Sequence, residues 1–426
     1  MKIEIKNGHV IDPANGIDRP ANVYVAEGRI VAVGKAPQGF TAEGSIDAGE
    51  CVVCPGLVDL AVRLREPGFE YKATLESEMA AAAAGGVTSL ACPPDTDPPL
   101  DEPGLVEMLK HRARLPDFAH VYPIGALTLG LAGERLTEMA ELAEAGCIAF
   151  GQANTVILNT QVLMRAMQYA ATFGFPVWLA AQDPYLAKNG VAHEGEVSAR
   201  LGLPGIPVVA ETIALATILH LARETGARLH VTRISSADGV EMVRAARRAG
   251  IAVTCDVSVN HLHLCENDIG YFDPHARLDP PLRAAADRDA LRAGLADGTI
   301  DALCSDHTPV DDDGKQAPFD EAEAGATGLE LLLPLMLKWS LDAKVPLAQA
   351  IARVTSEPAR VLGIEAGTLG VGSAADICVF DPRAKASVTR QRLKSQGKNT
   401  PFLGRELPGE VRYTLIDGHL AYSPPL

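Results

Sequence analysis

The chain has 426 residues, with 38 Lys and Arg against 54 Asp and Glu, which gives a formal net charge of -16 with neutral histidines. At roughly 100 to 200 residues per domain, this length allows two or three domains, or one large barrel with an appendage. The acidic surplus argues against nucleic acid and anionic membranes as partners. No uncharged apolar stretch approaches the roughly 18 to 20 residues of a membrane-spanning helix, and the N-terminal segment MKIEIKNGHVIDPANG alternates instead of forming a signal peptide. We therefore expect a cytoplasmic protein.

The eight cysteines mostly lie within apolar runs, where a reduced thiol behaves as a small hydrophobic side chain. Cys51 and Cys54 form a CxxC motif, but on a strand this spacing directs the two side chains to opposite faces. A second CxxC motif, which a zinc site of this kind needs, is missing from the sequence. We expect the cysteines to be free thiols in the hydrophobic core.

Both ends of the chain have the pattern of short antiparallel strands. Residues 1–53 alternate apolar and polar side chains and are interrupted by Gly, Asn and Pro, and the same pattern returns over 367–426. The two ends are predicted to form one composite β-sandwich domain.

Between these ends, over residues 54–366, near-continuous apolar strands alternate with amphipathic helices. Such strands are typical of a parallel sheet that is covered on both faces. Eight of them favour a closed (β/α)₈ TIM barrel, with a doubly wound open sheet as the alternative. The predicted strands are PGLVDLAVRL, VTSLACPP, HVYPIGAL, CIAFGQA, PVWLAAQ, RLHVTRIS, AVTCDVSV and DALCSDH, and the predicted helices include residues 74–85, 134–145, 160–173, 207–224 and 237–249.

The motifs at the carboxyl ends of these strands resemble one family. The first strand reads PGLVDLAVRLREPG (55–68), which is similar to the PGxxDxHxHxREPG motif of the dihydroorotases in the amidohydrolase superfamily. The resemblance extends along the chain and implies the amidohydrolase type of (β/α)₈ barrel. Its further matches are GGVTSLACPPDT (85–96), RLDPPLR (277–283), DHTP (306–309), APFDEAEAGATGLE (317–330), SEPARVLGIEAGTLGVGSAADICVFDP (356–382) and KNTPFLGRELPGEV (398–411).

The resemblance also implies metal ligands that this sequence has lost. The family has histidines, or acidic residues that bridge two metals, where this chain has Ala61, Arg63, Gln152, Ala153, Ala180 and Arg233. Asp306 is the one ligand of the set that remains, with His307 beside it. Because zinc needs three or four converging protein ligands, we expect no zinc and no other cofactor in this site. Without a metal, nothing activates water for hydrolysis, so Asp306 and His307 are expected to be catalytic remnants only.

The substrate-binding positions are altered as well. Arg65 remains and could pair with a carboxylate, but Asp95 and Asp279 replace two asparagines of the family. These carboxylates should repel an anionic substrate. The two arginines at 63 and 233 need partners if they are buried, so Asp306, Asp95 or Asp279 should lie within salt-bridge reach of them.

Two other sets of side chains invite a ligand interpretation. His261 and His263 have the spacing of paired ligands on a strand, but the family has two adjacent histidines there outside its metal ligands, so a structural role is favoured. The run DDDGK (311–315) lacks the spaced oxygens of a calcium loop and is predicted to be a solvated turn.

A barrel that keeps its scaffold and loses its ligands suggests a role other than catalysis. The resemblance includes catalytically inactive homologues that assemble with aspartate transcarbamoylase, and we expect this chain to be such a subunit of pyrimidine biosynthesis, in homo-oligomers and hetero-oligomers. Two alternatives stay open. One is an active dihydroorotase, or a related cyclic amidohydrolase, with a displaced metal site. The other is a sensor in which Arg65 and the altered pocket hold a carboxylate ligand.

Overall fold

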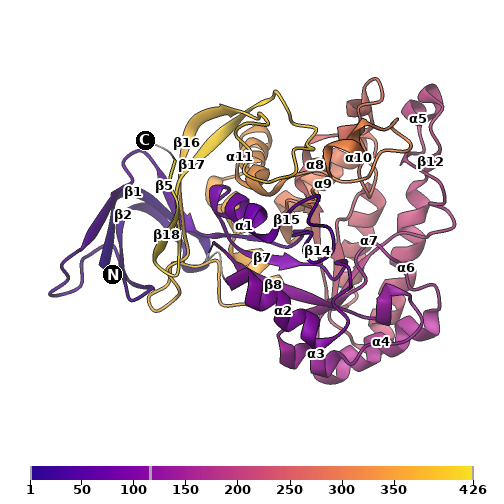
Figure 1. The fold of residues 1–426 in the computed structure, drawn as a ribbon, viewed down its shortest axis with the longest axis horizontal. Helices are drawn as coiled ribbons and strands as arrows, with labels where there is room; N and C mark the ends of the chain where they lie inside the picture. The colour runs from indigo at the N-terminus through magenta and orange to yellow at the C-terminus, as the bar shows by residue number, and fades with distance from the viewer. Residues whose placement is uncertain (1, 115–117, 425–426) are drawn as a thin grey trace.

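The structure is a computed structural model that describes residues 2–114 and 118–424. Figure 1 shows a β domain built from both termini on one side and a helix-covered barrel on the other. The predicted (β/α)₈ barrel of amidohydrolase type is confirmed. None of the helices in these two ranges combines the length and apolarity needed to cross a bilayer.

The barrel consists of eight parallel strands. Seven ladders join neighbouring strands, and the first and last strands meet through a parallel bridge between Val62 and His307. Two backbone hydrogen bonds support this closure, from Arg63 N to the His307 carbonyl and from His307 N to the Ala61 carbonyl, both 2.9 Å. The open doubly wound alternative is therefore wrong. The barrel strands are β6 (Leu57–Asp59), β7 (Val87–Cys92), β8 (His120–Ala126), β9 (Ala149–Gly151), β10 (Val177–Ala180), β13 (Leu229–Thr232), β14 (Val253–Ser258) and β15 (Ala302–Cys304).

The helices of the barrel agree closely with the pattern of apolar residues. The exception is α3, predicted from residue 134, which begins at Met139 because Leu136 pairs with Thr128 in a bridge and Thr137 Oγ1 donates to the Ala126 carbonyl. The helices are α1 (Leu75–Ala84), α2 (Pro103–Arg114), α3 (Met139–Ala145), α4 (Thr160–Phe173), α5 (Glu196–Leu201), α6 (Val208–Thr225), α7 (Ala237–Arg248), α8 (Val259–His263), α9 (Ala285–Asp297), α10 (Asp312–Gln316), α11 (Leu332–Ala343), α12 (Leu347–Ala352) and α13 (Ser356–Leu362).

Short elements complete the barrel and its loops. They are the two-stranded sheet of β11 (Ala192–His193) and β12 (Gly205–Ile206), and the 3₁₀ helices η1 (Pro13–Asn15), η2 (Leu129–Leu131), η3 (Glu266–Ile269), η4 (Pro274–Ala276) and η5 (Leu329–Leu331).

The β domain combines strands from both termini around an apolar core of its own, which includes Ile5, Val25 and Val53 from one end and Ile377 and Leu415 from the other. Hydrogen bonds join these strands into one eight-stranded sheet, where the sequence suggested a sandwich. Its strands are β1 (Lys2–Asp12), β2 (Ile17–Ala26), β3 (Arg29–Val33), β4 (Gly44–Asp47), β5 (Val52–Pro55), β16 (Ile377–Ser387), β17 (Glu406–Ile416) and β18 (His419–Tyr422).

The two ends of the chain meet where β5 pairs with both β1 and β16. The boundary expected between residues 53 and 54 falls within β5. The segment between β16 and β17 reaches back to the barrel, where Asn399 donates to the carbonyls of Thr308 and Gly325 and accepts from Val310 N. Part of the C-terminal region therefore supports the loop that follows β15.

The cysteines are thiols of the core, as predicted. Seven of the eight are buried and Cys51 is partly exposed. Cys54 on β5 lies directly opposite Cys378 on β16, and the contact with this thiol, together with burial, raises the pKa of Cys54.

Candidate functional site

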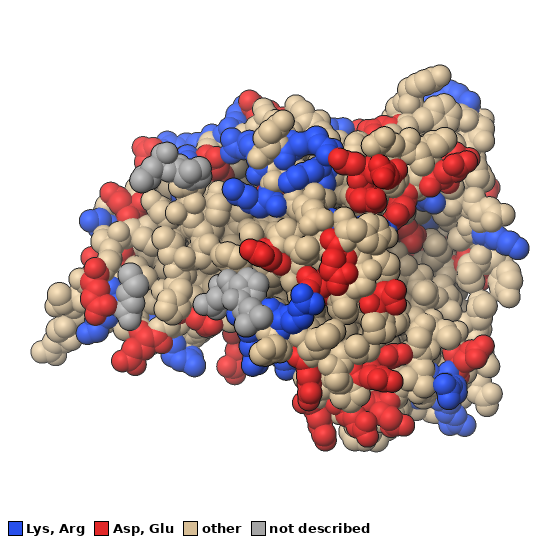
Figure 2. Space-filling view, viewed as in Figure 1, with Lys and Arg blue, Asp and Glu red and all other residues tan. Residues whose placement is uncertain are grey.

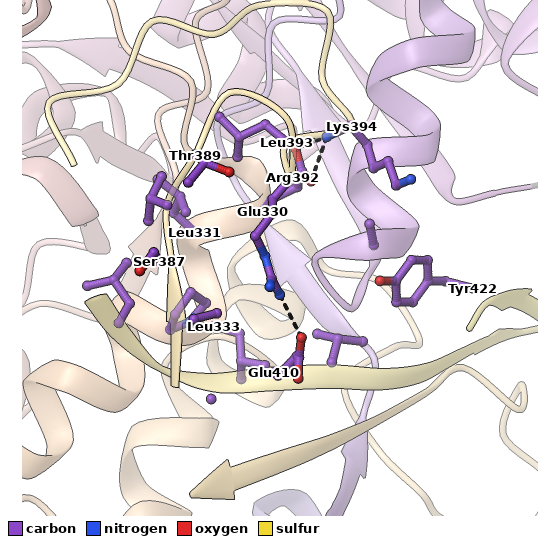
Figure 3. Close-up of a pocket in the computed structure, with 17 residues that line it drawn as sticks. Glu330, Leu331, Leu333, Ser387, Thr389, Arg392, Leu393, Lys394, Glu410 and Tyr422 are labelled. Carbon is purple, nitrogen blue, oxygen red and sulfur yellow. Dashed lines mark hydrogen bonds and ion pairs between the residues drawn. The ribbon is translucent and has the colours of Figure 1, made fainter. Parts of the chain in front are cut away.

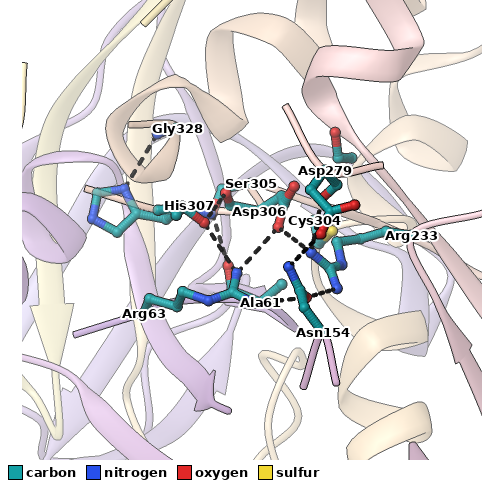
Figure 4. Close-up of polar contacts among 12 residues, drawn as sticks. Ala61, Arg63, Asn154, Arg233, Asp279, Cys304, Ser305, Asp306, His307 and Gly328 are labelled. Carbon is teal, nitrogen blue, oxygen red and sulfur yellow. Dashed lines mark hydrogen bonds and ion pairs between the residues drawn. The ribbon is translucent and has the colours of Figure 1, made fainter. Parts of the chain in front are cut away.

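The carboxyl ends of the barrel strands surround a small group of charged and polar side chains, which we call the mouth cluster: Arg63, Asp95, Asn154, Arg233, Asp279 and Asp306. Figure 4 shows all of them except Asp95 with labels. Each member follows a different strand or lies in a loop above the barrel. Only 5 to 7% of the surface of Arg63, Arg233 and Asp306 is exposed. In a barrel of this type the catalytic site lies at this end, so the mouth cluster occupies the place of an active site.

Arg63 lies at the centre of the cluster. Its Nε donates to Asp95 Oδ2 at 2.7 Å, its Nη2 to Asn154 Oδ1 at 3.0 Å, and its Nη1 to Thr308 Oγ1 at 3.0 Å. Nη1 also lies 3.6 Å from Asp306 Oδ1. Burial opposes ionisation of Arg63, but Asp95 and Asp306 outweigh it and raise its pKa above the usual value. The guanidinium is therefore a fixed cation with all of its nitrogens engaged.

Arg233 approaches the same groups from the opposite side of the barrel. Its Nη1 donates to Asp306 Oδ1 at 3.2 Å and to the backbone carbonyl of Asp279 at 3.2 Å, and its Nη2 donates to Asn154 Oδ1 at 2.5 Å. Asn154 in turn donates to Asp279 Oδ2 at 3.0 Å. The arginines pair with Asp95 and Asp306, two of the three acids that we expected within reach, whereas the Asp279 side chain is linked to them only through Asn154.

The pKa values of the two carboxyl groups that pair with the arginines shift in opposite directions. Burial would raise the pKa of Asp95, but the contact with Arg63 outweighs it and the pKa is lowered. At Asp306 burial prevails over the attraction of Arg233 and Arg63, so its pKa is raised. Asp306 Oδ1 faces both guanidinium groups, so its negative charge interacts with both arginines.

Strained backbone persists at the ends of the strands. Arg65, Ala153, Arg233 and Asp306 all have left-handed backbone conformations, with φ between 49° and 64°. Residues other than glycine rarely adopt this region, and such residues concentrate at functional sites. Strained backbone of the kind found at functional sites thus gathers at the mouth of the barrel.

The other residues that we singled out lie around the cluster or outside it. Ala61 lines a cavity beside Arg63, and Ala180 lines one beside Arg233. Gln152 faces the neighbouring loop, where its Nε2 donates to Thr128 Oγ1 at 2.7 Å. Arg65 donates from Nε to the Pro309 carbonyl at 2.9 Å and lies over the ring of Phe69.

His307 points away from the cluster, as Figure 4 shows. Its Nε2 lies 2.5 Å from Glu78 Oε2, and its Nδ1 accepts from the backbone N–H groups of Gly328 and Leu329. Because Nδ1 accepts, the proton of a neutral ring lies on Nε2. His307 therefore holds a loop in place and does not belong to the mouth cluster.

His261 and His263 have structural roles, as predicted. His261 Nε2 contacts the Pro281 carbonyl at 3.1 Å, and His263 Nε2 contacts the Leu335 carbonyl at 2.8 Å. Burial lowers the pKa of each to about 4. The run 311–315 is no loop in the structure: helix α10 occupies most of it, and the Lys315 ammonium donates to three backbone carbonyls, which corrects the prediction of a turn.

Little space remains at the mouth. The two cavities that touch Arg233 enclose about 20 and 40 Å³. A water molecule needs roughly 10 to 15 Å³ of such volume, whereas sites for small-molecule ligands have roughly 300 to 1,000 Å³. The two guanidinium groups fill the space between the strands, so the residues present do not fit a catalytic zinc ion.

A larger cavity of about 120 Å³ lies elsewhere, between β16, β17 and the start of α11 (Figure 3). Three of its charged side chains have partners: Arg392 Nη2 donates to Glu410 Oε1 at 2.6 Å, and Glu330 accepts from the backbone N–H of Lys394. Burial raises the pKa of Glu330 to about 6. This cavity has no contact with the mouth cluster.

Comparison with known proteins agrees with the barrel and its motifs. The family model described as dihydro-orotase-like matches residues 50–239. A dihydroorotase-like protein of Pseudomonas putida is 46% identical over 424 residues and covers all of both chains. The chain belongs to the dihydroorotase-like family. This places it in the amidohydrolase superfamily.

Other relatives carry a different name. A protein called dihydroorotase from Geobacter sp. (strain M21) is 41% identical, with 99% of this chain and all of the relative covered. Among solved structures, L-hydantoinase from Arthrobacter aurescens is 26% identical and superposes with a TM-score of 0.88, covering 99% of this chain and 96% of that one. The chain thus shares its fold with this L-hydantoinase over almost its whole length.

Sequence reasoning missed two members of the site. Asn154 bridges both arginines and Asp279, and Thr308 binds Arg63. Their sequence signal was position alone: Asn154 directly follows a strand end, and Thr308 lies in the DHTP motif.

Proposed function

We propose that this chain is a noncatalytic dihydroorotase-like subunit, which assembles with aspartate transcarbamoylase and stabilises it in pyrimidine biosynthesis. One observation carries the proposal: Arg63 and Arg233 fill the mouth of the barrel and pair with Asp306. A guanidinium carries no lone pair for a metal and stays protonated under ordinary conditions. This arrangement leaves the hydrolytic reaction without its activated water.

The choice of partner follows from the family resemblance, in which inactive homologues assemble with aspartate transcarbamoylase. A protein retained without catalysis has to act through its surface. A groove of about 150 Å³ on the outer face of the barrel, lined by Leu158 and Ile213, supports such a role. Leu158 is 57% exposed and Ile213 is 47% exposed, and exposed apolar side chains that lie together mark interaction surfaces.

Charge distribution favours a partner with complementary patches. On the face turned to the viewer, Figure 2 shows acidic side chains over the lower part near α3 and around α10, and basic ones gathered near α11. The acidic side includes four exposed glutamates in and before α3: Glu134, Glu138, Glu141 and Glu144. Such patches accelerate association and weaken as salt is raised, whereas an apolar contact persists.

The test is to purify this chain and aspartate transcarbamoylase of the same organism and to mix them at micromolar concentration. Size-exclusion chromatography with light scattering should give one mixed complex, because a specific interface above about 1,000 Å² survives purification. Transcarbamoylase alone should be less stable or less active. Two independent peaks with unchanged transcarbamoylase activity would contradict the proposal.

An active dihydroorotase is the second candidate, since several relatives near 40% identity carry that name. It requires a metal set other than the lost positions of the mouth. Turnover of dihydroorotate that depends on added zinc would favour this candidate. The third candidate is a carboxylate sensor built on Arg65. It has little support, because the cavities at the mouth, of about 20 and 40 Å³, have room for only a few water molecules.

A further inference from the structure

Three side chains with donor atoms for metals meet at the opposite end of the barrel from the mouth cluster. His120 is the first residue of β8, Asp376 directly precedes β16, and Asp417 lies in the turn between β17 and β18. Their ligand atoms all lie within 4.8 Å of one another. In residues 2–114 and 118–424, this is the one such group of three His, Cys, Asp or Glu side chains. We refer to it as the seam site, because it joins the barrel to the β domain.

The separations fit metal coordination. His120 Nε2 lies 3.2 Å from Asp376 Oδ2 and 3.7 Å from Asp417 Oδ2. Bonds of roughly 2.0 to 2.2 Å at tetrahedral or octahedral angles place neighbouring ligand atoms about 3.0 to 3.5 Å apart. The two separations from His120 are therefore close to those of metal ligands, and all three ligand atoms lie within 4.8 Å of one another.

The backbone holds the two carboxylates in place. Asp376 Oδ1 accepts from Asp417 N–H at 2.9 Å, which leaves Oδ2 directed at His120. The backbone carbonyl of Asp376 accepts from Gly56 N at 2.8 Å, and Gly418 N donates to the Ala375 carbonyl at 3.1 Å. Ligands fixed in this way lose little freedom when they bind an ion.

Burial and access also favour a ligand here. The Asp376 side chain is 10% exposed and lies beside His120 and a second carboxylate, so a cation bound among them offsets the repulsion between the two acids. His120 and Asp417 line a surface cavity of about 610 Å³, through which an ion and its remaining water ligands can enter. Lys110 lies in the same cavity, but its Nζ donates to the Ala145 carbonyl at 3.2 Å.

We propose that His120, Asp376 and Asp417 bind a divalent transition metal ion that clamps the β domain to the barrel. One imidazole and two carboxylates suit zinc or manganese, and waters complete the coordination. The ion has a structural role, since the site lies at the amino end of β8 and the catalytic end of such a barrel is the carboxyl end.

The experiment uses the full chain after dialysis against a chelator. Titration with Zn²⁺ should give one ion per chain by calorimetry and should raise the melting temperature. His120→Asn and Asp417→Asn should each lower Zn²⁺ affinity at least about tenfold, because loss of a direct ligand costs more than loss of the groups that orient it. Asp417 is 53% exposed, so its replacement should leave the fold intact.

His9→Asn is the matched control. His9 Nε2 also lies close to a carboxylate, Asp18 Oδ1 at 2.6 Å, but as an exposed pair with one acid. This variant should bind Zn²⁺ as the unchanged chain does. Absence of Zn²⁺ binding at tens of micromolar, or equal affinity in the chain with and without His120→Asn, would overturn the proposal. Zinc binding that is lost with Asp306→Asn instead would overturn both the seam site and the metal-free mouth of the proposed function.

Discussion

Arg63 and Arg233 share a single carboxylate oxygen, since their Nη1 atoms lie 3.6 and 3.2 Å from Asp306 Oδ1. They also share the side-chain oxygen of Asn154. Two positive charges this close repel each other, so the acidic side chain between them is required for both to be buried. The pairing with Asp306 is therefore a condition of the stability of the mouth.

The first prediction concerns this dependence. Asp306→Asn should destabilise the chain by about 3 kcal/mol, because it leaves two buried guanidinium groups without their shared charge. Unfolding in urea, followed by circular dichroism, measures the change. Glu406→Gln is the control: it breaks an exposed pair with Lys385, whose side chains are 59% and 67% exposed, and should cost less than about 1 kcal/mol. Equal effects of the two variants would contradict the role of Asp306.

The second prediction concerns catalysis. The purified chain should not interconvert carbamoyl aspartate and dihydroorotate, with or without added zinc, because the positions of the metal ligands hold Ala61, Arg63, Ala180 and Arg233. Any zinc that the chain carries should be unaffected by Asp306→Asn. Turnover above that of a heat-inactivated sample would contradict the predicted lack of activity. Metal analysis of the Asp306→Asn variant checks whether its zinc content is unchanged.

The third prediction concerns the partner surface. Ile213→Asp places a charge in the groove on the outer face and should weaken association with aspartate transcarbamoylase at least about tenfold, as expected where an apolar contact is lost. Val371→Asp is the matched control, because Val371 is an equally simple apolar side chain, 73% exposed, in the β domain. Light scattering on mixtures measures both. Association unchanged by Ile213→Asp would direct the search to another face.

The fourth prediction is a dependence of stability on pH. Burial lowers the pKa of His261 from 6.5 to about 4 in the folded chain. Between these values the unfolded chain binds a proton that the folded chain does not, so stability is full above pH 6.5 and falls as pH decreases towards 4. Each pH unit in this range lowers the free energy of unfolding by about 1.4 kcal/mol.

A variant isolates this contribution from that of other groups. His261→Asn cannot titrate, so its stability relative to the unchanged chain should improve by about 2 to 3 kcal/mol between pH 7 and pH 4.5. Buried carboxyl groups such as Asp59, whose pKa is raised to about 6 by burial, act in the opposite direction and are common to both chains. Parallel stability curves for the two chains would show that His261 does not titrate on unfolding.

Much of the fold could be predicted from the sequence, since periodic apolar residues determine where helices and buried strands form. The helix predicted over 160–173 forms exactly that range as α4 in the structure, and the motif after each strand predicted which residues line the mouth. The pairing of Arg63 and Arg233 with acids followed from the cost of burying an unpaired charge.

Other features depend on the path of the chain in space. His307 directly follows Asp306, yet its ring turns to Glu78 on α1, and no local pattern records this direction. The seam site gathers residues from three distant segments, and only Asp376 lies in a family motif, 356–382, which gives no sign of the other two. Asn154 is a neutral amide whose role depends on charges supplied by other loops.

The pairing of β5 with β16 joins residues 52–55 to residues 377–380. During synthesis, the strands of the N-terminal region therefore emerge long before the strands that complete their sheet. Until the last part of the chain leaves the ribosome, the apolar side chains of β1 and β5 lack one side of their core, and unpaired strand edges of this kind promote aggregation. Truncation near the C-terminus should thus prevent the first fifty residues from folding, and this chain should depend on chaperones until its synthesis is complete.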